Sequence, residues 1–93
     1  MAKSRFLDSR PTELELVELT VTRIDRVAAR VKLSQQSVCR EIMKDNRLYV
    51  HLVERIDALR SGSFLQRQQT RSITMALYDR IHEGLDELEA TAA

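Results

Sequence analysis

Apolar residues recur along most of the chain at spacings of three and four, which is the period of an amphipathic helix. Thr12 and Glu15 have the spacing of a capping box, in which each side chain binds a backbone N–H of the other residue. A first helix is therefore expected to begin there and to run to about position 19. Thr20 or Thr22 can cap a second helix that ends near Lys32. The inward positions of these two helices are Leu14, Leu16, Val17, Leu19, Ile24, Val27, Ala28 and Val31.

Two shorter helices are expected in the middle of the chain. Ser34 is a good N-cap for the first of them, with Val38 and Ile42 four residues apart on its buried face. The pair Asp45-Asn46 would end it. The next helix is expected to end at Ser61-Gly62-Ser63, where a glycine between two serines predicts a loop.

The last segment, from about Phe64 to Thr91, carries a long apolar stripe with helical spacing. At 1.5 Å per residue a helix of about 25 residues would be roughly 38 Å long, so it needs a surface to cover its stripe. That surface is either the other helices of the same chain or a second copy, and the pattern alone leaves both open. With few glycines and prolines and no extended alternation, the chain is expected to be all-α with about five helices. The stripe consists of Ile73, Leu77, Ile81, Leu85 and Leu88.

Charge divides the chain into segments that the net value of +1 conceals. Residues 21–60 carry nine basic and five acidic side chains, whereas residues 78–93 carry one basic and five acidic ones. A basic middle beside an acidic tail is typical of a module that faces a polyanion. We therefore expect a flexible arm over residues 1–11, a compact helical core over residues 12–60, and a C-terminal helix with an acidic tail over residues 61–93.

Several classes of site have no support in the sequence. Cys39 is the only cysteine, and His51 and His82 have no ligand-spaced partners, so neither a disulfide nor a metal site is expected. No catalytic constellation, phosphate-binding loop or cofactor motif is recognisable, and we expect a protein without enzymatic activity and without a cofactor. No apolar run approaches the roughly 18 residues of a membrane span, and the start has no apolar signal core. A cytoplasmic protein is the expectation.

One twenty-residue run carries more information than the rest. Residues 24–43 have the sequence IDRVAARVKLSQQSVCREIM. This run resembles the helix-turn-helix of the lambdoid phage repressor and Cro family. The resemblance lies in a small residue where two helices cross (Ala28), apolar residues before and inside the turn (Val31 and Leu33) and a β-branched anchor in the second helix (Val38).

Two positions depart from that family's pattern. Lys32 stands where the family commonly has glycine, so the resemblance implies a positive φ at this lysine. Glu41 stands where a hydrophobic residue is more usual, which would shift the buried face of the second helix.

The resemblance implies that the second helix lies in the DNA major groove with its first residues at base edges. Glutamine can donate to and accept from adenine, and arginine can donate twice to guanine, so Gln35, Gln36 and Arg40 are expected to contact bases. With Val38 and Ile42 pointing inward, Cys39 is expected to be a small, semi-exposed residue near the same outer face. Residues expected to hold phosphates are Arg23, Ser34, Ser37, Lys44 and Arg47.

These expectations combine into one functional hypothesis. The chain would be a sequence-specific, duplex DNA-binding transcriptional regulator, a repressor, of the kind found in phages. A twofold homodimer of this family places two recognition helices about 34 Å apart on one DNA face, so the stripe from Ile73 to Leu88 is expected to form the dimer interface.

Two other classes of function remain open. A helical protein-interaction module, such as an antiactivator or a phage adaptor, would share the apolar stripe and use the polar face of the third helix differently. Arg26, Arg30, Lys32 and the pair Arg40-Glu41 also show a faint similarity to the small helical chorismate mutases, in which basic side chains clamp a dicarboxylate inside a helix bundle.

Overall fold

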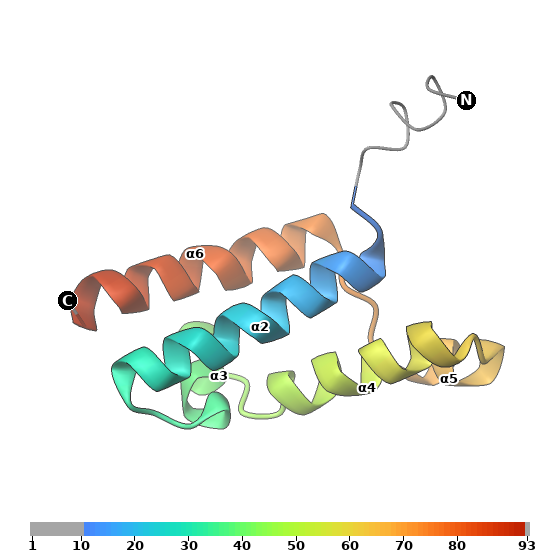
Figure 1. Cartoon of the computed structure of the whole chain (residues 1–93), viewed down its shortest axis with the longest axis horizontal. Coiled ribbons are helices and arrows are strands. Elements are labelled where there is room, and N and C mark those ends of the chain that lie inside the picture. The colour runs from blue at the N-terminus through green and yellow to red at the C-terminus, as the bar shows by residue number, and fades with distance from the viewer. Residues whose placement is uncertain (1–10, 93) are drawn as a thin grey trace, which may run out of the picture.

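The computed structural model describes residues 11–92, and this part of the chain is built from five helices joined by turns (Figure 1). The all-α expectation is confirmed. The expected flexible arm lies, apart from Pro11, outside the described residues. The helices are α2 (Glu13–Val31), α3 (Gln35–Met43), α4 (Leu48–Ser61), α5 (Phe64–Gln69) and α6 (Met75–Ala92).

Helix α2 begins as the sequence indicates but continues further than expected. Thr12 is the N-cap: its hydroxyl accepts the Glu15 backbone N–H at 3.2 Å, and the Glu15 carboxylate accepts the Thr12 N–H at 3.1 Å. The expected break near Thr20 is wrong. The Thr20 hydroxyl donates to the carbonyl of Leu16 at 2.8 Å, one turn back, so this side chain lies buried inside one continuous helix and caps nothing.

The expected single helix from Phe64 to Thr91 is also wrong, because the chain leaves the helical conformation after α5. Thr70 is extended, with φ −103° and ψ 153°. The backbone N–H of Ile73 donates to the Glu13 carboxylate at 2.8 Å, so this linker binds the start of α2. Thr74 then accepts the Leu77 N–H at 3.1 Å in the first turn of α6.

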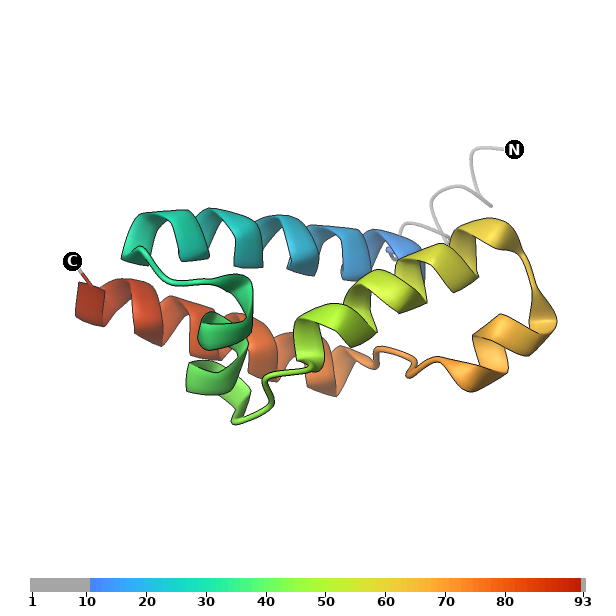
Figure 2. The ribbon, with the colours of Figure 1, turned by 90° about the horizontal axis from the view of Figure 1, so that it is seen from below.

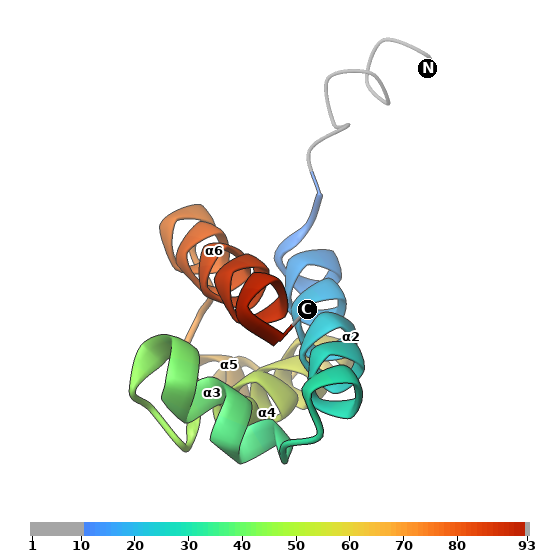
Figure 3. The same ribbon diagram turned by 90° about the vertical axis from the view of Figure 1, so that its left-hand side faces the viewer.

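The helices form two layers. Helices α2 and α6 lie side by side and run in the same direction, and α3 and α4 pack beneath them (Figures 1 and 3). Seen from below, α3 is a short segment near one end of the molecule, while α5 projects at the other end (Figure 2). The described chain is elongated, with principal extents of 45 × 31 × 20 Å.

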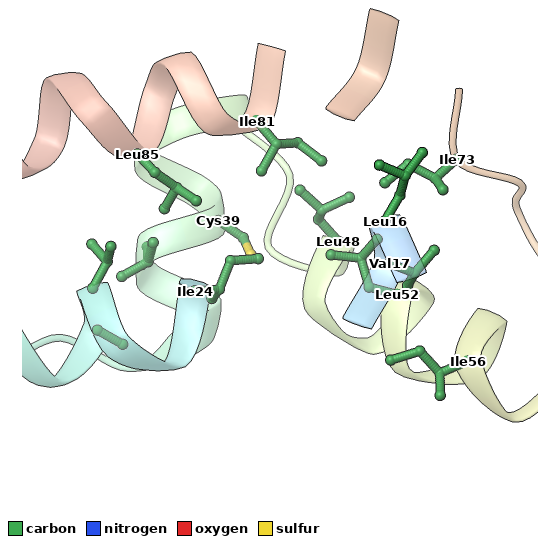
Figure 4. Close-up of a cluster of buried hydrophobic side chains, with 13 residues drawn as sticks. Leu16, Val17, Ile24, Cys39, Leu48, Leu52, Ile56, Ile73, Ile81 and Leu85 are labelled. Carbon is green, nitrogen blue, oxygen red and sulfur yellow. The ribbon is translucent and has the colours of Figure 1, made fainter. Parts of the chain in front are cut away.

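The apolar stripe of α6 and its preceding linker completes the core of this same chain. Ile81 and Leu85 are fully buried, and they point toward Ile24 of α2 and Leu48 of α4 (Figure 4). Ile73 is buried, while Leu77 and Leu88 pack against the same cluster from its edge. The expectation that this stripe forms a dimer interface is therefore wrong, and the alternative that it folds back on the chain's own helices is confirmed.

Helix α6 approaches α3 most closely at Gly84. A Cβ atom on residue 84 would lie 2.7 Å from Cβ of Ile42 and 3.5 Å from its Cα. Only glycine permits this separation, because real Cβ atoms essentially never come within 3.0 Å of another heavy atom. This glycine therefore sets the distance between the two helices.

One buried ion pair holds the α5 end of the molecule together. The Arg55 side chain donates to both carboxylate oxygens of Glu13 at 2.8 Å, and also to the Arg67 carbonyl at 2.7 Å and the Thr70 hydroxyl at 3.0 Å. The hydrogen bonds that Glu13 accepts from Arg55 and from the Ile73 N–H hold its pKa below the usual value. The pair joins α4 to the start of α2 and to the linker before α6, which explains why α5 and α6 are separate.

Candidate nucleic-acid interface

A three-residue turn joins α2 to α3. Lys32 adopts the left-handed conformation, with φ 61° and ψ 44°, and its backbone N–H binds the carbonyl of Ala28. The Leu33 N–H donates to the same carbonyl at 3.0 Å. Ser34 then caps α3 by accepting the Ser37 N–H at 3.1 Å. The positive φ expected at Lys32 is present, and the N-cap expected at Ser34 is confirmed.

Helix α3 buries the expected face of Val38 and Ile42, and it also buries Cys39. Val38 is fully buried, as predicted, but so is Cys39, because α2, α4 and α6 all pack against this short helix. The expectation of a semi-exposed cysteine on the outer face is wrong. Burial raises the pKa of the Cys39 thiol to about 11. Ile42 is half-buried on the same inward side, facing Gly84.

The outward side of α3 carries exposed polar side chains. Gln36 and Arg40 are exposed and lie one turn apart on the helix, and Lys44, the left-handed C-cap residue that follows it, is exposed four residues further on. Ser37, half-buried, lies beside these side chains, where its hydroxyl accepts from that of Ser34 at 2.9 Å. We call Gln36, Arg40 and Lys44 the outer row of α3.

Gln35 is not part of the outer row. Its side-chain amide donates to Oδ1 of Asp25 in α2 at 3.3 Å, and the Tyr49 hydroxyl of α4 donates to the same oxygen at 2.7 Å. Burial and this hydrogen bond to Asp25 raise the pKa of Tyr49 to about 12. Gln35 is half-buried and its amide is engaged by Asp25 in a solvent-exposed hydrogen bond, so the structure does not place it with Gln36 and Arg40 as a second base-contacting residue.

Arg23, expected at a phosphate, is bound to α6 instead. It forms an ion pair with Asp86 and donates to the Glu89 carboxylate at 2.9 Å and to Nδ1 of His82 at 3.1 Å. Because α2 is continuous, Arg23 lies in mid-helix and not at a helix start. The expected helix start beside Arg23 is therefore wrong, and the Arg23 side chain already has two carboxylate partners on α6.

His82 is the centre of a polar cluster between α2 and α6 that the sequence did not reveal. Its Nε2 lies 3.0 Å from the Thr20 hydroxyl, and its ring packs on Tyr78 with centroids 4.0 Å apart. Burial, and secondarily the charge of Arg23, lower the pKa of His82. A solitary histidine gave no sequence pattern by which to find this cluster, because its partners come from a distant helix.

The basic side chains near α3 are concentrated at its two ends. Lys32 precedes the helix, Lys44 ends it and Arg47 follows, and all three are exposed. Within residues 11–92, the ion pairs do not involve these three side chains or Arg40. Acidic side chains lie close by: Glu41, which is exposed and follows Arg40 in the chain, and Glu87 line a groove of about 220 Å³ between α3 and α6.

The basic residues that suggested a chorismate mutase do not converge. Arg26, Arg30, Lys32 and Arg40 are all exposed, and Arg30 lies 3.6 Å from Glu89 on the surface. No group of three or more potential metal ligands occurs among residues 11–92. Similarly, no helix in this part of the chain has the length and apolar character needed to cross a membrane.

Comparison with protein-family models, with curated proteins and with solved structures gives no match to this chain. A functional proposal therefore depends on the geometry and chemistry of α3 and its surroundings.

Proposed function

We propose that this chain binds double-stranded DNA in a sequence-specific manner, with α3 in the major groove, and that it acts as a transcriptional regulator, a repressor. The observation that carries the proposal is the outer row of α3. Gln36 and Arg40 are exposed along one side of a short helix whose opposite side is buried, and the exposed Lys44 directly follows it. An α-helix with its side chains is about 10–12 Å in diameter, which fits the major-groove width of about 12 Å.

The side chains of the outer row have the chemistry that base contacts require. The Gln36 amide can donate to N7 of adenine and accept from its N6 amino group in a bidentate pair. The Arg40 guanidinium can donate to both O6 and N7 of guanine. Each such pair discriminates against a wrong base by about 1–3 kcal/mol. The base-contacting set thus becomes Gln36 and Arg40, since Gln35 already binds Asp25.

Phosphate contacts would come from the two ends of α3. Lys32, Ser34 and Ser37 lie at its start, and Lys44 and Arg47 at its end. Side chains of these types bind phosphate oxygens and fix the register of a protein on the duplex. The acidic side chains Asp86 and Glu89 of α6 bind Arg23, and Glu87 lines the groove beside Glu41.

A homodimer on a twofold site remains part of the proposal, as does a cytoplasmic location, but the dimer needs a surface other than the α6 stripe. One observation also favours a second candidate function, a protein-interaction module. Phe64 and Leu65 of α5 are 74% and 62% exposed, at the opposite end of the molecule from α3. Exposed apolar side chains of this size are typical of protein contacts.

The test is a titration of a random-sequence duplex by fluorescence anisotropy at about 50 and 200 mM salt, with the mass measured by light scattering. Binding in the micromolar range that weakens by orders of magnitude at the higher salt is expected, because several phosphates are neutralised. A protein-interaction module would show no binding at either salt concentration.

Variants of the outer row sharpen this test. After a preferred duplex has been selected from a random pool, Gln36→Ala and Arg40→Ala should each weaken its binding by about 1–3 kcal/mol and leave the fold intact. Arg80→Ala is the matched control, because Arg80 is exposed on α6 and its substitution removes the same charge. If Arg40→Ala and Arg80→Ala weaken binding equally, α3 provides only charge and the proposed base contacts are wrong.

A further inference from the structure

The polar cluster of Asp25, Gln35 and Tyr49 joins three helices at one carboxylate oxygen. Asp25 lies on α2, Gln35 in the first turn of α3 and Tyr49 in the first turn of α4. The two donors reach Oδ1 of Asp25 at 3.3 Å and 2.7 Å. Hydrogen bonds to a charged acceptor are about twice as strong as those between neutral groups, so this oxygen is well suited to hold both donors.

We infer that these three residues are positioning residues: they fix the orientation of α3 against α2 and α4, and thereby set the sequence specificity of the outer row. This inference rests on the proposed function. Gln35 immediately precedes Gln36, so the hydrogen bond to Asp25 restrains the very turn from which the outer row begins. Base pairs are discriminated by bidentate hydrogen bonds, and a rotation or shift of α3 by about 1 Å would misalign them.

The cluster restrains α3 where apolar packing does not. Val38, Cys39 and Ile42 anchor the middle and end of the inward face. At the start of α3, the exposed fraction of Leu33 is 42%, so it contributes little packing there. The solvent-exposed hydrogen bond from the Gln35 amide to Asp25 is a side-chain contact that joins this first turn to α2. Phosphate contacts depend on charge and tolerate small displacements, whereas base contacts do not, so loss of the cluster should affect specificity more than general DNA affinity.

The experiment compares binding of the duplex selected by the unchanged protein with binding of a random-sequence duplex at about 50 mM salt. Tyr49→Phe removes the hydroxyl donor and keeps the ring. Its matched control is Tyr78→Phe, on the half-buried tyrosine of α6 that stacks on His82. Tyr49→Phe should lower the ratio of selected to random affinity about 5- to 10-fold, with random-duplex affinity unchanged within twofold, whereas Tyr78→Phe should leave the ratio unchanged. Circular dichroism and thermal melting verify that each variant is folded.

The double variant Tyr49→Phe/Gln35→Ala separates positioning from direct base contact. Positioning through one shared oxygen predicts that the double variant loses no more specificity than the stronger of the two single variants. Asp25→Asn, which keeps an oxygen acceptor, should retain more specificity than Asp25→Ala. The inference would be overturned if the fold-losses of specificity of the two single variants multiply in the double variant and the double variant no longer distinguishes the base pair at one position of the selected duplex. That result would show that Gln35 contacts a base.

The two proposals fail in different ways. If the unchanged protein binds random duplexes and selects a preferred one, but Tyr49→Phe has the same ratio as Tyr78→Phe, only the positioning role is overturned. If the unchanged protein binds no duplex at the lower salt, the proposed function is wrong and the positioning role is overturned with it.

Discussion

Replacing Gly84 with alanine tests the closest approach of two helices in this fold. Two effects of opposite sign compete. Alanine is favoured over glycine inside a helix by about 1 kcal/mol, so an unobstructed site would gain that amount. At position 84, however, the new methyl carbon would lie 2.7 Å from Cβ and 3.2 Å from Cγ2 of Ile42.

The clash is expected to outweigh the gain in helix propensity. The Ile42 Cβ atom moves only with its backbone, so α3 or α6 must shift, and overpacking of this kind costs about 1–3 kcal/mol. The net prediction for Gly84→Ala is a loss of about 1 kcal/mol, with a value near zero if the helices separate easily. For a domain of this size, 1 kcal/mol corresponds to roughly 4–8 °C in Tm.

The assay is urea unfolding followed by circular dichroism, with a matched pair of variants at the neighbouring residue. Glu83 is exposed on α6, so the difference between Glu83→Ala and Glu83→Gly measures helix propensity alone at almost the same place. That difference should be about 1 kcal/mol in favour of alanine. The reasoning is refuted if Gly84→Ala is more stable than the unchanged protein by about the same 1 kcal/mol, because the close approach to Ile42 would then cost nothing.

Three further predictions follow from buried polar groups. Arg55→Met should lower the free energy of unfolding, measured in urea, by about 2–3 kcal/mol. This is less than the usual ~3–5 kcal/mol for breaking a buried pair, because the Glu13 side chain keeps 26% of its surface exposed. An unchanged urea midpoint would contradict the role given to this pair. The pKa of His82 is lowered in the folded state, so the unfolded state binds more protons as the pH falls. The stability that comes from the neutral ring is complete above about pH 6.5 and is lost as the pH falls through the folded pKa. In thermal melts between about pH 7 and 5, the Tm of His82→Gln should therefore depend less on pH than the Tm of the unchanged protein. With its pKa raised to about 11, the Cys39 thiol should react with iodoacetamide at pH 8 only upon unfolding, which mass spectrometry with and without urea would show; rapid labelling of the native protein would contradict its burial.

The local signals in the sequence were sufficient for several helix ends. The box of Thr12 and Glu15 and the serine at position 34 cap the helices that they were expected to cap. Gly62 ends α4 with a φ of 74°, as the loop around it indicated. These features depend on side chains within three or four residues of the backbone groups that they bind, which is why one sequence is enough to identify them.

Contacts between distant residues decided the features that were predicted wrongly. The hydroxyl of Thr20 can cap a helix or bind one turn back, and only burial against His82 determines which of these it does. The break after α5 depends on Glu13, about sixty residues earlier in the chain. Arg23 and Gln35 have the right chemistry for DNA but meet carboxylates across the fold, and no spacing in the sequence reveals those partners.

Two lysines in the left-handed conformation limit α3 to a short helix. Lys32 and Lys44 have φ values of 61° and 54° and terminate the chain's helical path immediately before and after this element. The residues that end the helical path and those that pack α3 against the core are therefore different from the residues on its outward side. Gln36 and Arg40 project away from the core and bind no other side chain within the described residues, so they can be exchanged without cost to folding. The scaffold of α3 therefore does not depend on Gln36 and Arg40. Under the proposed function, substitutions at these two positions are expected to change the DNA sequence that is bound while the fold stays the same.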